Sequence, residues 1–144
     1  MDDHPTGLTE AQRDALLAAA HVALQRAYAP YSRFPVGAAV LDDQGRIHAG
    51  CNVENAAYPQ GVCAEAGALS AMVLAGGRSV QAVLVAGDGE GLVTPCGGCR
   101  QKIREFAGPQ TPILIAGARR LRARFTLDEL LAHSFGPEHL GQGQ

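Results

Sequence analysis

Tryptophan is absent from the 144-residue sequence, and aromatic residues together make up only 5% of it. Hydrophobic residues nevertheless account for 47% of the chain, so the sequence predicts a core built from alanine, valine, leucine and isoleucine. A chain of this length typically forms one domain, and we expect residues 1–144 to do so. The polar ends predict disorder at residues 1–7 and 141–144.

A strong charge of either sign is also missing. Basic residues number 12 and acidic residues 14, which gives a formal net charge of −2. Proteins that bind polynucleotides usually carry a basic surface. The densest basic run, residues 119–124, is short and predicts a solvated strand or turn. We therefore expect no nucleic-acid partner.

Long apolar runs are absent as well. Residues 1–4 are acidic overall, and no apolar stretch predicts a signal peptide or a membrane span. We expect a cytoplasmic protein with no membrane partner. The four cysteines are too few for a disulfide framework, and a reducing compartment would keep them available as thiolates.

Three of these cysteines lie in two short motifs, Cys63-Ala64-Glu65 and Pro95-Cys96-Gly97-Gly98-Cys99. Zinc takes four ligands, and a catalytic zinc site usually leaves one position to water. Three thiolates would fill the other positions. Glu65 is too close to Cys63 to be a comfortable fourth ligand but is well placed to move protons. This order and spacing is typical of zinc deaminases, in which the carboxylate is not a ligand.

Other interpretations of the same cysteines explain less of the sequence. A closed structural zinc site would need a fourth protein ligand, and no histidine lies near either motif. A redox pair at Cys96 and Cys99 would have suitable spacing but would leave Cys63 and Glu65 unexplained. For the remaining thiol, Cys51, we expect a small buried residue near a strand end.

Hydrophobic periodicity predicts alternating helices and strands, which favours a layered α/β fold. A capping box of Thr9 and Gln12 begins the first helix, Pro30 is a plausible stop, and Gly76-Gly77 closes the second helix. Pro95 suits the first turn of the third. The predicted helices cover 9–26, 62–75, 94–106 and a short segment opening at 126–129. The predicted strands cover 36–41, 46–53, 80–86, 112–116 and 121–125.

This arrangement places the two motifs at helix starts. Free amide groups and the helix dipole there favour thiolates at Cys63 and Cys96, and Cys99 would share a helix face with Cys96. Zinc would lower the pKa of bound water from about 15.7 towards 7. Glu65 would take a proton from that water and deliver it to a ring nitrogen and then to the departing amine. The predicted chemistry is hydrolytic removal of an amine from an amidine-like ring.

From about residue 8 to 140, the chain resembles the small zinc-dependent cytidine deaminases. The matching segments are 31–39 (YSRFPVGAA), 50–58 (GCNVENAAY) and 95–101 (PCGGCRQ). The resemblance implies a three-layer α/β/α sandwich with a mixed central sheet and one Zn²⁺ per subunit. It also implies deamination of cytidine and 2′-deoxycytidine in pyrimidine salvage, by a homotetramer that shares its active sites between chains.

The resemblance further implies roles for individual residues. Cys63, Cys96 and Cys99 would hold zinc, and Glu65 would be the proton shuttle. Asn52 and Glu54 would bind the ribose 3′-hydroxyl, and the negative charge of Glu54 would repel a phosphate. Phe34 would stack on the pyrimidine. Further substrate contacts would come from Ala64, from Tyr58 at a subunit boundary, and from Phe135, which would reach a neighbouring subunit's site.

One position departs from the resemblance. Many relatives carry arginine directly after the catalytic glutamate, where it bonds to the cysteine sulfurs, but this chain has Ala66. Three thiolates on one zinc carry a net charge of −1, so the metal should acidify water less well without that arginine. Our hypothesis is that Arg100, which follows Cys99, partly replaces it.

Three alternative functions differ from the leading one. A related aminopyrimidine nucleoside, such as a blasticidin-type antibiotic, would be the substrate of a second kind of deaminase. A polynucleotide base editor would share the metal motif, but the acidic chain argues against it. In a zinc-binding module without catalysis, the substitution Glu65→Gln would change nothing measurable. In an enzyme, the same substitution would abolish most of the turnover and leave the metal bound.

Overall fold

The computed structural model describes residues 7–141 of the chain. A five-stranded sheet lies at its centre, in the order β2-β1-β3-β4-β5. β1 pairs antiparallel with β2 and β3, β3 pairs parallel with β4, and β4 pairs antiparallel with β5, so the sheet is mixed. The strands are β1 (Val36–Asp42), β2 (Ile47–Cys51), β3 (Val80–Gly87), β4 (Pro112–Ala116) and β5 (Leu121–Thr126).

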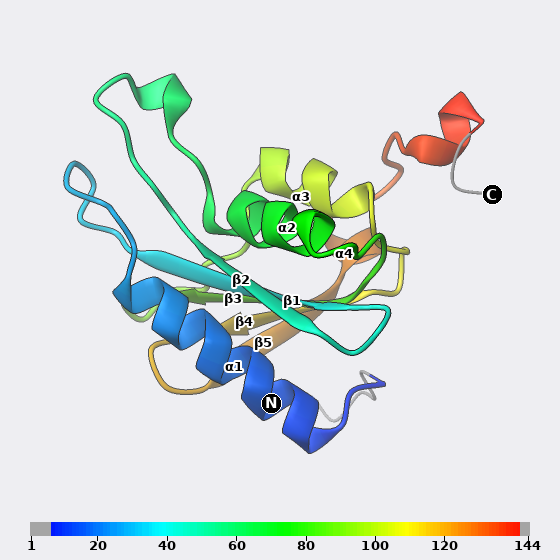
Figure 1. Cartoon of the computed structure of the whole chain (residues 1–144), viewed down its shortest axis with the longest axis horizontal. Coiled ribbons are helices and arrows are strands. Elements are labelled where there is room, and N and C mark those ends of the chain that lie inside the picture. The colour runs from blue at the N-terminus through cyan, green and yellow to red at the C-terminus, as the bar shows by residue number, and fades with distance from the viewer. Residues whose placement is uncertain (1–6, 142–144) are drawn as a thin grey trace.

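Helices cover both faces of this sheet (Figure 1). Helix α1 (Glu10–Gln25) packs on one face, and α2 (Ala64–Leu74) and α3 (Gly97–Arg104) lie side by side on the other. A short helix, α4 (Leu127–Leu130), follows β5. The predicted three-layer α/β/α sandwich is confirmed.

The central strands contribute alternate residues to two apolar cores, because successive strand side chains point to opposite faces. Val83 and Val85 of β3 pack with α2 and α3, whereas Ala82 and Leu84 pack with α1. β1 divides its residues in the same way. The predicted aliphatic core is therefore present on both sides of the sheet.

Two glycines let the helices approach the sheet closely. A Cβ atom at Gly50 of β2 would lie 2.3 Å from the backbone nitrogen of Ala68 in α2. At Gly37 of β1 it would lie 2.0 Å from the carbonyl oxygen of Ala20 in α1. Any side chain at these positions would push its helix away from the sheet. Gly50 matters for the site because α2 begins beside the first metal motif.

The boundaries of several predicted elements need correction. The first helix has its predicted capping box but ends at Gln25, so Pro30 is not its stop. The third helix starts at Gly97 with Cys96 as its N-cap, so Pro95 precedes the helix. Two short 3-10 helices, η1 (Tyr58–Gln60) and η2 (Pro137–Leu140), were not predicted.

The expected disorder of the two ends falls almost wholly on residues 1–6 and 142–144, which lie outside the described residues. Gly7 occupies a bend and Gly141 caps η2. Between these two residues, the chain has no helix that is both long and apolar enough to cross a membrane.

Candidate zinc and active site

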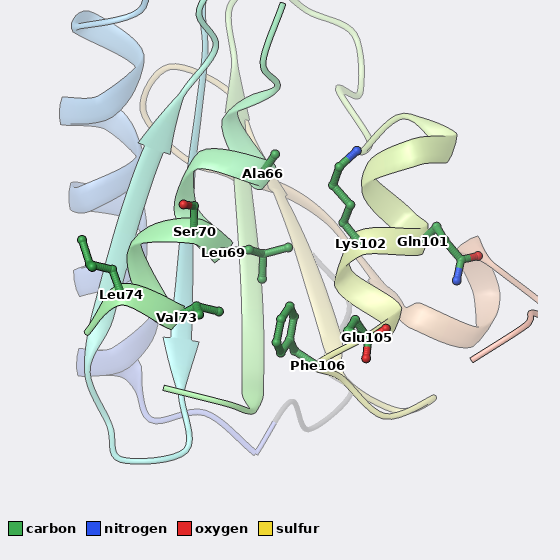
Figure 2. Close-up of a pocket in the computed structure, with 9 residues that line it drawn as sticks. All are labelled: Ala66, Leu69, Ser70, Val73, Leu74, Gln101, Lys102, Glu105 and Phe106. Carbon is green, nitrogen blue, oxygen red and sulfur yellow. The ribbon is translucent and has the colours of Figure 1, made fainter. Parts of the chain in front are cut away.

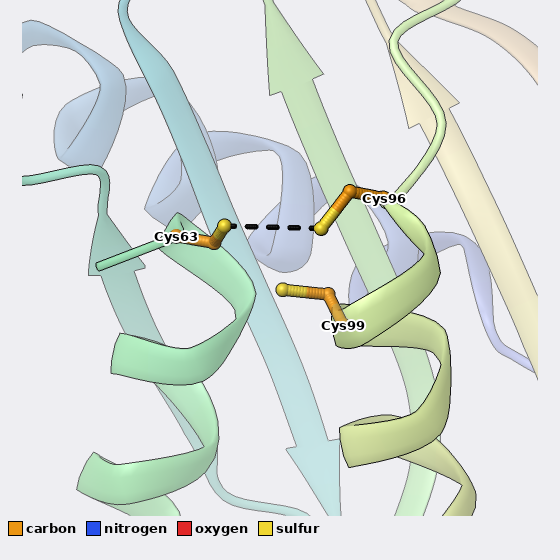
Figure 3. A group of neighbouring side chains, drawn as sticks. All are labelled: Cys63, Cys96 and Cys99. Carbon is orange, nitrogen blue, oxygen red and sulfur yellow. Dashed lines mark hydrogen bonds between the residues drawn. The ribbon is translucent and has the colours of Figure 1, made fainter. Parts of the chain in front are cut away.

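Three thiols meet where α2 and α3 begin. Cys63 is the N-cap of α2, Cys96 is the N-cap of α3, and Cys99 lies in the first turn of α3. Their sulfur atoms all lie within 4.8 Å of one another, and 3.9 Å separates the sulfurs of Cys63 and Cys96 (Figure 3). Thiolates are soft donors that suit zinc. The cluster is positioned to bind one metal ion.

The cluster has an open side. Within residues 7–141, no histidine or acidic side chain joins the three cysteines as a fourth donor. Cys51 lies at the end of β2, partly buried, and is not part of the group. A closed structural zinc site would need four protein ligands. The observed donor set instead leaves one coordination position for water or substrate.

Glu65 lines the same cavity as Cys63 and Cys96. It is in the first turn of α2 and only 5% of its surface is exposed. Burial raises the pKa of its carboxyl group, although a backbone hydrogen bond and the charge of Lys102 partly oppose this. A raised pKa brings a carboxyl group closer to the range in which a general acid–base works best. Its position and pKa suit proton transfer.

A cavity of about 190 Å³ joins Glu65 to the thiols. One side is formed by the start of α2, and another by the end of β2 and the loop before α3. The lining residues are Val36, Asn52, Cys63, Ala64, Glu65, Val93, Thr94 and Cys96. The sequence motifs indicated the cysteines and Glu65, but Val93 and Thr94 carry no signal that marks them as lining residues.

The three metal-free thiols have different acidities. The backbone N–H of Cys99 lowers the pKa of Cys96, as expected for a helix start. Partial burial raises the pKa of Cys63, and burial followed by the charge of Glu65 raises that of Cys99. At Cys63, the effect of burial on the pKa is larger than any lowering by the helix start. A bound metal would have to displace protons from Cys63 and Cys99.

Arg100 supports the ligand loop and does not reach the sulfurs. Its guanidinium donates to the carbonyl oxygens of Pro95 (2.7 Å) and Leu130 (2.8 Å), and to the hydroxyl of Thr94 (3.1 Å). Among the described residues, the guanidinium makes no hydrogen bond to a cysteine, and only the backbone N–H of Arg100 donates to Cys96, at its carbonyl oxygen (3.0 Å). Our hypothesis that Arg100 takes over at the thiolates does not match these contacts. Its donors instead fix the turn that presents Cys96.

Comparisons with known proteins agree with this geometry. Residues 10–115 match the family described as "Cytidine and deoxycytidylate deaminase zinc-binding region". The chain belongs to the cytidine deaminase family. Family members are zinc-dependent hydrolytic enzymes, so the cysteine cluster is the zinc site of a hydrolase.

Individual relatives support the assignment. A cytidine deaminase of Sporosarcina psychrophila is 42% identical over 127 residues, which is 88% of this chain and 93% of the relative. One from Mycobacterium tuberculosis is 45% identical over 115 residues, 79% of this chain and 82% of the relative. The crystal structure of cytidine deaminase from Burkholderia pseudomallei has a TM-score of 0.79 at 38% identity. That alignment covers 89% of this chain and 100% of the other.

Asn52 joins two backbone segments beside the cavity that Glu65 lines. Its Oδ1 accepts a hydrogen bond from the backbone of Val36 (2.9 Å), and its Nδ2 donates to the carbonyl of Phe34 (2.9 Å). It also lines the cavity. The ring of Phe34 itself is 42% exposed and does not line the cavity.

Glu54 faces a second hollow of about 310 Å³, lined by Tyr31, Ser32, Glu54, Asn55, Tyr58 and Gly61. Its Oε1 accepts hydrogen bonds from the backbone of Tyr31 (2.9 Å) and Ser32 (3.1 Å). Hydrogen bonds from Ser32 are the largest influence that lowers the pKa of this carboxyl group. Sequence reasoning missed the contribution of Tyr31 and Ser32, because they lie 23 and 22 residues from Glu54 in the sequence.

Tyr58 and Phe135 are both largely exposed in the single chain. Tyr58 is 76% exposed and packs near Tyr31, with ring centroids 6.0 Å apart. Phe135 is 57% exposed, stacks on His139, and accepts a hydrogen bond from Gln101 at its carbonyl oxygen. Phe135 lines neither the cavity at Glu65 nor the hollow at Glu54.

Proposed function

We propose that this chain catalyses the hydrolytic deamination of cytidine and 2′-deoxycytidine to uridine and 2′-deoxyuridine, with release of ammonia. The observation that carries the proposal is the buried carboxyl group of Glu65, which lines a cavity together with two thiols of the three-cysteine cluster. Membership of the cytidine deaminase family supports the choice of substrate.

Glu65 is the proton shuttle of the proposed mechanism. Cys63, Cys96 and Cys99 would hold zinc, which would act as a Lewis acid and lower the pKa of water. Glu65 accepts a proton from the attacking water and delivers it to the ring nitrogen, while the water's oxygen adds to the carbon that bears the amine. Glu65 then passes the second proton to the amine, which leaves as ammonia. One water is consumed, and the product ring carries a carbonyl in place of the amine.

The ribose would be held by Asn52 and Glu54. The Oε2 atom of Glu54 and the remaining amide hydrogen of Asn52 are suited to a free hydroxyl, since the other atoms of both groups are held by the backbone. A low pKa keeps Glu54 ionised at neutral pH, which favours a hydroxyl over a phosphate. Ala64 lines the cavity beside Glu65, and Phe34 would stack on the pyrimidine.

In a homotetramer with shared sites, Tyr58 would lie at a subunit boundary and Phe135 would reach the active site of a neighbouring subunit. Both rings are largely exposed in the single chain. A groove of about 770 Å³ between α2 and α3 offers apolar surface for a second copy (Figure 2). Leu74, at its rim, is 90% exposed. We place the enzyme in cytoplasmic pyrimidine salvage, where free nucleosides are the substrates.

The proposal is tested by following the ultraviolet absorbance of cytidine with zinc-loaded protein, together with an ammonia assay. We expect one ammonia per cytidine consumed, and no reaction after zinc is removed by a chelator. A well-loaded protein that leaves cytidine and 2′-deoxycytidine unchanged would overturn the substrate assignment. Turnover of another aminopyrimidine nucleoside in the same assay would then favour the antibiotic-type alternative.

A further inference from the structure

The proposed zinc site has an excess of negative charge. Three thiolates on Zn²⁺ sum to −1, and the carboxylate of Glu65 adds another negative charge when it is ionised. Negative charge in a partly buried site is costly unless a cation lies nearby. Arg100 does not serve this purpose, because its donors are directed to Pro95, Thr94 and Leu130.

Lys102 is the cation that faces this region. It lies one turn beyond Cys99 on α3, and helical side chains lean towards the start of their helix. Its ammonium group folds back over Gly98, where an added Cβ atom would lie 3.6 Å from Nζ. Gly98 is between the two cysteine ligands of α3, so the ammonium lies near the metal-binding end of the helix.

Lys102 belongs to the last turn of α3, but its ammonium group reaches back to Gly98 in the first turn. The first turn of a helix carries partial positive charge, which disfavours an ammonium group. Within residues 7–141, Lys102 takes part in no ion pair and no side-chain hydrogen bond that would hold it there. A negatively charged metal site would offset the unfavourable dipole.

Ala66 makes room for this ammonium. Ala66 directly follows Glu65 on α2 and lines the groove that Lys102 lines from α3. In Figure 2, the methyl group of Ala66 and the ammonium of Lys102 point into the same space between the two helices. Glu105, the acidic residue on the same helix, points away from the ammonium in this view.

We propose that Lys102 supplies, from α3, the positive charge that balances the three-thiolate zinc site and Glu65. Lys102 is a positioning residue, because it acts on the ligands and on Glu65 and does not contact the reacting atoms. The effect on zinc binding depends only on the metal site. The effect on turnover rests on the proposed function.

The test compares Lys102→Met, Lys102→Arg and Glu105→Gln in full-length protein, with zinc affinity measured by competition against a chromogenic chelator. Loss of a group that supports metal ligands typically weakens metal affinity 10–100-fold, and we expect about tenfold for Lys102→Met at low salt. Lys102→Arg should restore most of the affinity, and Glu105→Gln should match the wild type.

Unchanged zinc affinity in Lys102→Met at low salt would overturn the proposal, as would a Lys102→Arg variant as weak as Lys102→Met. A third variant, Ala66→Arg combined with Lys102→Met, returns a cation to the same space from α2 and should regain affinity. Turnover of cytidine is measured in parallel. If the wild type binds zinc but does not deaminate cytidine, the proposed function fails, while the affinity series still decides the role of Lys102.

Discussion

Two glutamates of the site have surroundings that push their pKa values in opposite directions. Burial raises the pKa of Glu65, whereas hydrogen bonds from Ser32 lower that of Glu54. A group that exchanges protons must change its charge during the reaction, while a group that recognises a hydroxyl should keep its charge. The local surroundings thus suit each carboxyl group to its proposed role.

Glu54→Gln tests the proposed contact with the ribose. A hydrogen bond to a charged group contributes about 1.5–3 kcal/mol, so we expect kcat/KM for cytidine to fall by about tenfold to a hundredfold. The matched substrate is 3′-deoxycytidine, which lacks the hydroxyl. The wild type should lose a similar factor with this analogue, and the variant should show little further loss. If the variant lost the same factor with 3′-deoxycytidine as the wild type does, the two losses would be additive, which would contradict a direct contact between Glu54 and the hydroxyl.

At the residue scale, the sequence predicted the site residues that belong to a short motif. The metal ligands and Glu65 follow from two short motifs, because zinc chemistry restricts residue types and spacing. The roles of Arg100 and Lys102 were harder to predict. Both residues lie within three positions of Cys99, and only the path of each side chain in three dimensions distinguishes their roles. Arg100 holds a loop, and Lys102 reaches towards the metal end of α3.

At the scale of elements, helix α2 carries two of the site residues and rests on β2. Gly50 permits the contact, because a Cβ atom there would lie 2.3 Å from the backbone of Ala68 and 2.5 Å from that of Ala64. A shift of α2 would move Cys63 and Glu65 away from the thiols of α3. The seating of this helix therefore determines the geometry of the site.

Gly50→Ala should displace α2. Overpacking of a close contact typically costs about 1–3 kcal/mol, and we expect a loss of that size in the free energy of unfolding, with weaker zinc binding. Denaturant unfolding and the chelator competition measure both effects. Gly91→Ala is the control, because a Cβ atom at Gly91 meets nothing within 4 Å. If the Gly50→Ala protein were as stable as this control, the close contact between β2 and α2 would not determine the position of the helix.

The turn between β1 and β2 is held by the buried carboxylate of Asp42. Burial alone would raise the pKa of Asp42, but hydrogen bonds from His48 and from the Arg46 and Gln44 backbone outweigh it and hold the pKa far below its usual range. A depressed folded-state pKa contributes stability above the unfolded pKa of about 3.9, and that stability is lost as pH falls below it.

Asp42→Asn should therefore destabilise the protein most at neutral pH. Urea unfolding at pH 7 should separate the variant clearly from the wild type. The difference should begin to shrink at pH 3, because the wild type loses part of this contribution below the unfolded pKa and the rest only as pH falls through the much lower folded pKa. Taking the difference between the two proteins removes effects that both share, such as zinc loss in acid. A difference that stays constant or grows towards pH 3 would contradict the assignment.

Elements were predictable where local chemistry marks their ends. The capping boxes of Thr9 with Gln12 and Thr126 with Glu129 are both present. The strand order of the sheet and the close contacts at Gly37 and Gly50 depend on residues far apart in the sequence, which periodicity does not connect. The buried cluster around Asp42 was missed for a similar reason, because a turn aspartate resembles an exposed one in sequence.

At the scale of the whole molecule, the proposed homotetramer would bring residues of neighbouring chains to each active site. Phe135 follows α4, outside both hollows of its own chain, so a role at the substrate requires a neighbouring subunit. The apolar groove between α2 and α3 adjoins the helices that hold the metal ligands (Figure 2). Assembly and catalysis would then depend on the same surface.

Mixed tetramers test this dependence. Phe135→Ala alone should lower kcat/KM by about tenfold, the scale of base–aromatic stacking, and Glu65→Gln alone should be almost inactive. After co-refolding, sites that combine Glu65 of one chain with Phe135 of another should regain activity, measured per Phe135→Ala subunit. Activity that stays at the level of Phe135→Ala alone would place Phe135 in its own chain's site or outside any site.

The most direct test of the central claim is turnover of cytidine by Glu65→Gln, with the zinc content of the same sample determined. Removal of a general acid–base group typically costs 10²–10⁴-fold in rate, and we expect a loss of about that size with one zinc still bound per subunit. A zinc-loaded variant that deaminates cytidine at the wild-type rate would show that Glu65 does not move the protons of this reaction.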